Sequence, residues 1–401
     1  MKQSMEGLTE KAVRRNALVL SCAQALGGAS PAIVISLGGL VGQTLAEDKA
    51  LATLPVSLYN LGLALGTIPA AMLMRRLGRR AAYMLGAAIG VVAGLLGAHS
   101  ITSGAFALFC VATAIAGLYG SCVQSYRFGA TDGADPAFRA RAISWVMVGG
   151  LVGAVVGPQT VIWTRDAIAG IPFAGSFVGQ AALALLAIPV LMMLRGSVRP
   201  AAEQSGGRSL REIASSGRFV VAVIAGIVSF GMMSFVMTAA PIAMVACGHT
   251  VGEAAMGIQW HVLAMYAPSF FTGRLITRYG KERVTMAGLL LMAVSGTIAL
   301  AGLTVAHFWL SLVFLGVGWN LGFIGATAMV TDCYRPEERT KVQALNDFLV
   351  FGSVALASFS SGKLLNAAGW ETINWLLYPA VAAVLVPLLW QWGRTARRQA
   401  A

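Results

Sequence analysis

The stretch AMLMRRLGRR, residues 71–80, places four arginines between two long apolar runs. The second half of the chain contains a similar stretch, GRLITRYG, at residues 273–280. Three positions align at a constant offset of 202 residues: Leu73 with Leu275, Arg76 with Arg278, and Gly78 with Gly280. A basic turn that recurs in this way, each time between apolar runs, indicates a structural unit that the chain uses twice.

A second pair of loops repeats at an offset of 200 residues. The aligned positions are Thr131-Asp132 with Thr331-Asp332, Pro136 with Pro336, Arg139 with Arg339, and Arg141 with Lys341. Each loop follows the fourth apolar run of its half, just as each basic turn follows the second. The sequence therefore predicts two similar halves.

The composition is that of a membrane protein. Of 401 residues, 57% are hydrophobic and only 11% are charged, whereas soluble domains carry about 25% charged residues. The 47 glycines lie mostly within the apolar runs, which is typical of closely packed transmembrane helices. This excludes a soluble enzyme and a disulfide-stapled secreted module, and it predicts an all-α polytopic protein. We expect twelve spans, at 16–45, 50–74, 81–98, 104–126, 142–164, 173–194, 219–246, 255–277, 284–304, 308–331, 342–362 and 369–392.

The basic residues predict the orientation of these spans. If the N-terminus is cytoplasmic, the outward loops hold only Lys49, Arg165 and Lys363, and the other 26 of the 29 basic residues face the cytoplasm. Positively charged loops stay inside during insertion, so both termini are expected in the cytoplasm. The net charge of +13 is then a topology signal and not a sign of a nucleic-acid partner.

The longest hydrophilic stretch divides the chain. We expect an N-terminal six-helix bundle at 1–194, a cytoplasmic linker at 195–218 that contains Arg199, Glu203 and Ser205-Gly206-Gly207, and a C-terminal six-helix bundle at 219–401. Parallel repeats of six spans are a transporter architecture, with the substrate site at the repeat interface near the bilayer midplane.

The stretch at 71–80 and its echo at 273–280 resemble the loop motif of the major facilitator superfamily, and the resemblance extends over essentially the whole chain. It implies two pseudo-symmetric bundles that alternate access to a central site. The chain departs from the motif at Ala71, where the family has glycine, and at Arg75, where it has an aspartate that helps lock the halves together. We hypothesise a charge swap in which Arg75 or Arg76 pairs with Asp347. The alternative is that Asp347 packs locally.

Charged and titratable residues near the spans are the candidates for gating and coupling. For gating we select Arg75, Arg76, Gly78, Arg79, Arg127, Asp132, Arg278, Asp332 and Asp347. An ionisable residue inside a membrane is a functional candidate by default, so His261 and Asp347 are the candidates for proton coupling. Spans one to six contain no acidic residue well inside the apolar region, and a facilitator without ion coupling stays open.

Uncharged polar and aromatic residues near midplane predict the substrate. The candidate binding residues are Gln24, Tyr59, Asn60, Gln180, Trp260, His261, Tyr266, Trp319, Asn320 and Asn346. Taken singly, each could serve helix packing instead. No lysine or arginine lies at this depth, although Arg127 could reach the cavity in one conformation. We therefore expect a neutral or weakly charged molecule with hydrogen-bonding groups and a flat ring.

The stretches YRFGATD at 126–132, GWN at 318–320 and YRPEER at 334–339 resemble a bacterial subgroup of the superfamily that is associated with vitamin uptake, riboflavin in particular. The sequence thus predicts a monomeric transporter of the bacterial inner membrane, with the lipid bilayer and a small molecule as partners, and it leaves coupling to protons open. A proton-coupled multidrug exporter of the same fold is the alternative. We find no catalytic constellation and no cofactor motif, and the five scattered cysteines suggest neither a metal site nor disulfides.

Overall fold

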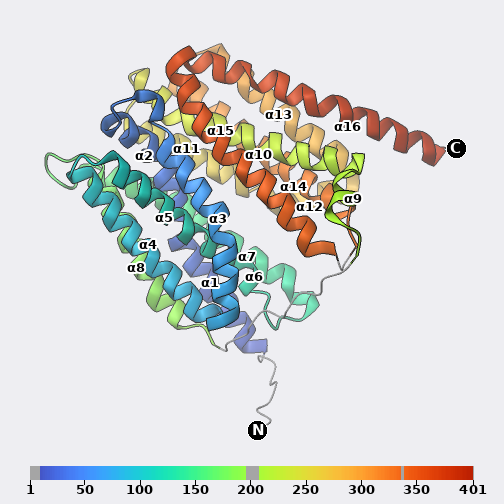
Figure 1. Cartoon of the computed structure of the whole chain (residues 1–401), viewed down its shortest axis with the longest axis horizontal. Helices are drawn as coiled ribbons and strands as arrows, with labels where there is room; N and C mark the ends of the chain where they lie inside the picture. The colour runs from blue at the N-terminus through green and yellow to red at the C-terminus, as the bar shows by residue number, and fades with distance from the viewer. Residues whose placement is uncertain (1–9, 196–206, 336–337, 401) are drawn as a thin grey trace, which may run out of the picture. The chain divides into compact units, whose positions relative to one another are not determined.

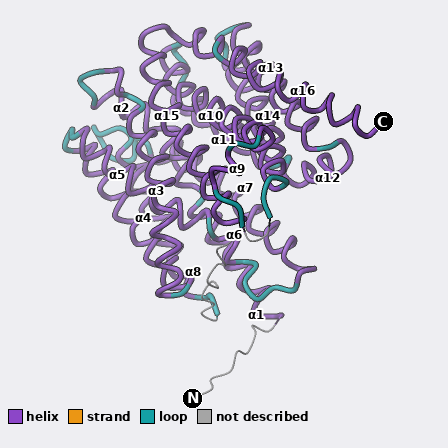
Figure 2. The backbone as a smooth tube through the Cα atoms, turned by 45° about the vertical axis from the view of Figure 1, so that its right-hand side comes forward, coloured by secondary structure: helices purple, strands orange, loops and turns teal. Residues whose placement is uncertain are grey.

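The computed structural model describes residues 10–195, 207–335 and 338–400, and every regular element in these ranges is a helix (Figures 1 and 2). Arg199, Glu203, Ser205, Gly206 and Pro336, which the sequence places in loops, lie outside the described residues. Within those ranges, ten helical segments are long and apolar enough to cross a membrane. The predicted all-α polytopic fold is confirmed, while the count of twelve spans stays a prediction.

The two predicted spans outside this group of ten coincide with broken or short helices. The span at 255–277 falls on α11 (Val251–Tyr266) and α12 (Ser269–Tyr279), which are separated at Ala267 and Pro268. The span at 369–392 begins at Gly369, where the backbone leaves the helical region with φ 77°. It continues as the shorter apolar helix Leu377–Gln391.

The described residues of the first compact unit are 10–34 and 61–195. Its helices are α1 (Glu10–Gly27), the start of α2 (Ala29–Leu45), most of α3 (Leu54–Leu77), α4 (Arg79–Thr102), α5 (Phe106–Gln124), α6 (Tyr126–Gly129), α7 (Pro136–Thr164) and α8 (Ala174–Met192). Helix α4 packs against α5 and α8, and α1 packs against α7. A Cβ atom on Gly149 would lie 2.1 Å from the Ser21 carbonyl oxygen, so glycine is what lets α7 approach α1 this closely.

The described residues of the second compact unit are 35–60, 207–335 and 338–400. Its later elements are η1 (Lys49–Leu51), α9 (Leu210–Ala214), α10 (Gly217–Ala246), α11, α12, α13 (Lys281–Ala301), α14 (Val305–Thr331), α15 (Arg339–Trp375) and α16 (Leu377–Ala400). Helix α10 packs against α15, and α14 packs against α13, α10 and α11. Residues 35–60 join this unit through hydrogen bonds to α15, from Gly362 N to Thr53 Oγ1 at 3.1 Å and from Asn60 Nδ2 to Ser358 Oγ at 2.9 Å. The predicted domain boundaries stay a prediction.

Asn320 braces the break between α11 and α12. Its Nδ2 donates to the Met265 carbonyl at 2.6 Å and to Ser269 Oγ at 2.7 Å, while its Oδ1 accepts from Thr272 Oγ1 at 2.6 Å. Pro268 has no N–H and interrupts the helical ladder, and a freed carbonyl inside a membrane needs a replacement donor. The buried amide of α14 supplies that donor.

The end of the linker is fastened to the second unit by a buried carboxylate. The Glu338 carboxylate accepts three hydrogen bonds from Arg208. The donors are the Arg208 backbone N at 2.7 Å, Nε at 3.0 Å and one terminal guanidinium nitrogen at 2.8 Å. The Arg335 backbone N donates to the same carboxylate at 2.9 Å. These hydrogen bonds hold the pKa of Glu338 well below its ordinary value, and the Arg208 side chain makes the largest contribution. Helix α9 follows at once and buries Ile213 in the core of the unit.

We expect Glu338→Gln to lower the melting temperature of the purified protein at pH 7, because an amide loses the charge-assisted bonds from Arg208. A carboxylate with a depressed pKa stabilises the folded state above its unfolded pKa of about 4.3 and loses this contribution as the pH falls. The difference between wild type and variant should therefore narrow only slightly at pH 4, because the folded pKa lies well below that pH, and it should keep narrowing as the pH falls further. The exposed Glu212→Gln serves as the control. Equal effects of the two substitutions would contradict the assignment.

Candidate functional site

Five aromatic rings gather inside the second unit, contributed by α10, α11, α14 and α15. The Phe230 ring packs edge-on against Trp319, Phe323 and Phe351, with centroids 5.2, 5.0 and 5.7 Å apart. Trp319 and Phe323 stack on each other at 5.4 Å with 15° between their planes. Tyr266 meets the Trp319 ring edge-on at 6.3 Å. We call Phe230, Tyr266, Trp319, Phe323 and Phe351 the aromatic cluster.

Local sequence explains how α14 presents this cluster. Trp319 and Phe323 are four residues apart, so they lie on one face of the helix. Gly318 and Gly322 lie beside them and let α13 approach the backbone of α14, since a Cβ on Gly318 would meet Met292 at 2.7 Å and one on Gly288 would meet the Gly322 nitrogen at 2.2 Å. Close packing by α13 thus fixes the position of the two stacked rings.

The cluster combines flat apolar surface with a hydrogen-bond donor that no described residue uses. Trp319 is only 7% exposed, and its Nε1 has no hydrogen-bond partner among the described residues. The four helices carry no lysine or arginine over 219–246, 251–266, 305–331 and 342–362. Such a surface suits an uncharged ring system with an acceptor on its edge.

The structure places the other predicted binding residues in different surroundings. Gln24 on α1 is half-buried, and Gln180 on α8 is buried with neither amide atom bonded to a described residue. Trp260 is exposed on α11, and His261 is buried with its Nδ1 2.7 Å from the Leu312 carbonyl. Tyr59 and Asn346 are buried, and the Asn346 amide donates to Asp347 at 3.1 Å. Whether these residues contact the substrate stays a prediction.

Of the predicted set, the structure brings Tyr266 and Trp319 together in the aromatic cluster, whereas Asn320 turns its amide to the α11–α12 break and Asn60 bonds Ser358. The sequence analysis did not select Phe230, Phe323 or Phe351. The spacing of Phe323 four residues after Trp319 was the one available signal. A phenylalanine in an apolar span is otherwise indistinguishable from a lipid-facing one.

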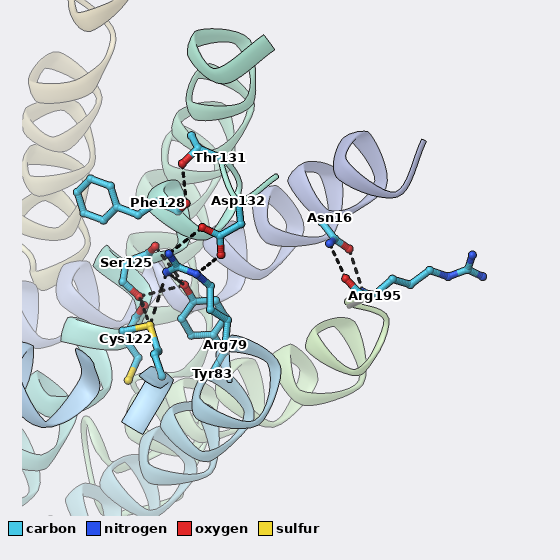
Figure 3. Close-up of polar contacts among 10 residues, drawn as sticks. Asn16, Arg79, Tyr83, Cys122, Ser125, Phe128, Thr131, Asp132 and Arg195 are labelled. Atoms are coloured by element: carbon cyan, nitrogen blue, oxygen red, sulfur yellow. Dashed lines mark hydrogen bonds and ion pairs between the residues drawn. The ribbon is translucent and has the colours of Figure 1, made fainter. Parts of the chain in front are cut away.

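A charge pair fixes the turn between α3 and α4 in the first unit (Figure 3). Arg79 binds Asp132 with two nitrogens, Nε to Oδ2 and a terminal nitrogen to Oδ1 at 2.9 Å. Its other terminal nitrogen donates to the Tyr83 hydroxyl at 3.1 Å, which lies 3.2 Å from the Ser125 carbonyl. Burial raises the pKa of Asp132 above its ordinary value, and the Arg79 hydrogen bond opposes this shift.

The second unit repeats this pair in the positions that the sequence repeat predicts. Lys281 Nζ binds Asp332 Oδ1 at 2.5 Å, and Lys281 follows Gly280 just as Arg79 follows Gly78. Both glycines have positive φ, 80° and 90°, a conformation that favours glycine. The repeated turn therefore has the same backbone and the same type of charge pair in each unit.

The remaining predicted gating residues lie at the surface. Arg75, Arg76, Arg278 and Asp347 are exposed, and the Arg127 guanidinium lies 4.9 Å from the Phe128 ring centroid. Arg75 and Asp347 belong to different units, so the charge swap stays a prediction. Within the described residues, no group of three or more His, Cys, Asp or Glu side chains could hold a metal ion.

Comparison with known proteins identifies the fold. The model of the Major Facilitator Superfamily matches residues 17–265 and 222–400. Riboflavin transporter RfnT of Brucella anthropi is 64% identical over 381 residues, which cover 94% of this chain and 96% of that protein. An uncharacterized MFS-type transporter of Bacillus subtilis, YdeG, is 30% identical over 405 residues, with 95% and 93% covered.

A solved structure supports the same conclusion at the level of the fold. The crystal structure of the nucleoside transporter NupG matches with a TM-score of 0.73 at 14% identity, covering 94% of this chain and 99% of that chain. The repeated turns, the helical units and these matches agree with the resemblance that the sequence suggested. The chain belongs to the major facilitator superfamily, as a non-enzymatic multi-pass membrane transporter.

Proposed function

We propose that this transporter carries riboflavin into the bacterial cell across the inner membrane. The observation that carries the proposal is the 64% identity, over 94% of the chain, to a protein named as a riboflavin transporter. The same likeness favours a vitamin carrier over the multidrug exporter that the sequence left as an alternative.

The aromatic cluster fits the chemistry of this substrate. Riboflavin is uncharged at neutral pH, and its isoalloxazine ring is flat with carbonyl acceptors along one edge. The stacked rings of Trp319 and Phe323 offer a matching surface, and the Trp319 Nε1–H offers a donor. The hydroxylated ribityl chain needs amide or hydroxyl partners, for which Asn346 is a candidate. The lack of lysine and arginine over 219–246, 251–266, 305–331 and 342–362 agrees with a ligand that has no phosphate.

The proposal includes alternating access by a monomer with both termini in the cytoplasm. The excess of basic residues in the predicted cytoplasmic loops supports that orientation. Residues 35–60 are bonded to α15 through Thr53 and Asn60, and we propose that these bonds break and reform as access alternates. Proton coupling, if present, would use His261 or Asp347. Counterflow with and without a pH gradient separates a coupled carrier from a facilitator.

The direct test is uptake of radiolabelled riboflavin into proteoliposomes. We expect saturable uptake and counterflow, with a preference of at least about tenfold over flavin mononucleotide, because burying its phosphate without a cation costs more than about 1.4 kcal/mol. Liposomes without protein give the background. Absence of riboflavin counterflow together with pH-driven movement of lipophilic drugs would overturn the proposal in favour of the exporter.

A further inference from the structure

A groove on the second unit is lined by one cation and by none of the residues of the aromatic cluster. It has a volume of about 490 Å³ and lies between α10, α15 and Leu376, the residue that follows α15. Apart from one exposed serine, its walls are five apolar side chains and one lysine: Phe235, Phe359, Lys363, Leu364, Ala367 and Leu376.

The shape of the groove follows from α15. Phe359, Lys363 and Ala367 are spaced four residues apart, so they form one stripe along the helix. The helix then breaks at Gly369, which has φ 77°, and the chain turns so that Leu376 completes the wall. The groove is thus apolar along its length, with one positive charge in its wall.

Lys363 has no carboxylate within ion-pair distance among the described residues. Its Nζ lies 4.7 Å from the centroid of the Phe359 ring. The other two cations of the predicted outward side both have polar partners within the protein. Lys49 donates to the carbonyls of Gln43 and Ala46, each at 2.7 Å, and Arg165 pairs with Asp166 at 2.8 Å.

Aromatic residues next to the groove indicate its depth in the bilayer. Trp375 and Tyr378 lie with ring centroids 5.4 Å apart, and Trp375 is 61% exposed. Tryptophan and tyrosine concentrate at the level of the lipid headgroups, and lysine side chains extend toward that level. Lys363 belongs to the predicted outward loop between the spans at 342–362 and 369–392, so its ammonium can reach the phosphates.

We propose that this groove binds an anionic phospholipid, with its phosphate at Lys363 and an acyl chain along Phe235, Leu364 and Leu376. Charge complementarity selects this occupant. A lysine beside an apolar groove at headgroup depth suits an anion joined to a hydrocarbon chain, and no carboxylate is among the residues that line the groove. The lipid would lie beside the Gly369 kink of α15 and stabilise the second unit. This inference does not depend on riboflavin as the substrate.

The experiment measures melting of the full-length protein in detergent as phosphatidylglycerol or phosphatidylcholine is added. We expect phosphatidylglycerol to raise the melting temperature at lower concentration than phosphatidylcholine does, since ligands that bind the folded state stabilise it by mass action. Lys363→Gln should raise the phosphatidylglycerol concentration for half the shift by about fivefold. Arg165→Gln, which removes a cation that is already paired, should leave that concentration unchanged.

A second variant tests the apolar part of the groove independently of the charge. Ala367→Trp fills the groove at an exposed position and should also weaken the response to phosphatidylglycerol. Equal stabilisation by the two lipids, or an undiminished response of Lys363→Gln, would overturn the proposal. A shift of the same size with inorganic phosphate alone would also overturn it, because an anion without a chain would then suffice.

Discussion

Replacing Trp319 by alanine is expected to raise the KM for riboflavin uptake by about 30- to 100-fold. Stacking of a flat heterocycle on an aromatic side chain is worth about 1–3 kcal/mol by alanine substitution, and each 1.4 kcal/mol is a factor of ten. The substitution removes both the stacked ring, 5.4 Å from Phe323, and the Nε1 donor that no described residue uses. Initial rates in proteoliposomes over a range of riboflavin concentrations give the KM.

Because removing a buried tryptophan also leaves a cavity, two phenylalanine variants separate binding from folding. Trp319→Phe keeps one stacking ring and loses the N–H together with the smaller ring of the indole, so KM should rise about fivefold, chiefly for a hydrogen bond of about 1 kcal/mol. Trp370 is the matched control. It is also 7% exposed, its Nε1 also lacks a described partner, and it packs on Phe308 at 5.2 Å outside the aromatic cluster. Trp370→Phe should leave KM unchanged, and equal shifts in the two variants would refute the site.

The sequence predicts the helical architecture well because span formation depends on local composition. A run of about 20 apolar residues must satisfy its backbone internally once it lies in lipid, so hydropathy alone places most helices. The repeat carries more information. The offsets of 200 and 202 residues predict which loops correspond, and the structure shows Arg79 with Asp132 and Lys281 with Asp332 in those loops.

The rest depends on contacts that composition does not encode. Phe230 and Phe351 come from helices 121 positions apart in the chain and meet only because α10 packs against α15. In spans that are apolar all round, the sequence does not show which face turns inward. Asn320 has the chemistry of a ligand-binding residue, but its amide is used by Met265, Ser269 and Thr272. That use follows from the Pro268 break, which hydropathy does not reveal.

Glu338 illustrates the same limit outside the membrane. It lies in the loop that corresponds to residues 131–141, but the first half has Phe138 at the equivalent position. The repeat therefore does not predict that Glu338 binds Arg208 of the linker. Features shared by the two halves are predictable from the repeat, whereas features of one half need the structure.

Burial distinguishes the two charge pairs of the repeated turn and leads to unequal expectations for their removal. Asp132→Asn should destabilise the protein by about 3 kcal/mol, because Arg79 would lose its counter-charge in a site where the two side chains are only 16% and 18% exposed. Asp332→Asn should change stability by at most about 1 kcal/mol, since Lys281 and Asp332 are 29% and 42% exposed. Thermal melting of the purified variants compares the two.

Transport should follow the same order, because the buried pair holds the turn at Gly78 against the loop after α6, with Tyr83 and Ser125 completing the network. We expect the riboflavin uptake rate at saturating substrate to fall by at least about tenfold in Asp132→Asn, equivalent to about 1.4 kcal/mol, and by less than half in Asp332→Asn. The double variant Arg79→Asp with Asp132→Arg should be more stable than either single variant. Equal losses in the two aspartate variants would mean that burial does not decide how much each pair contributes. If the double variant were no more stable than the single variants, the contact between Arg79 and Asp132 would not be what stabilises the turn.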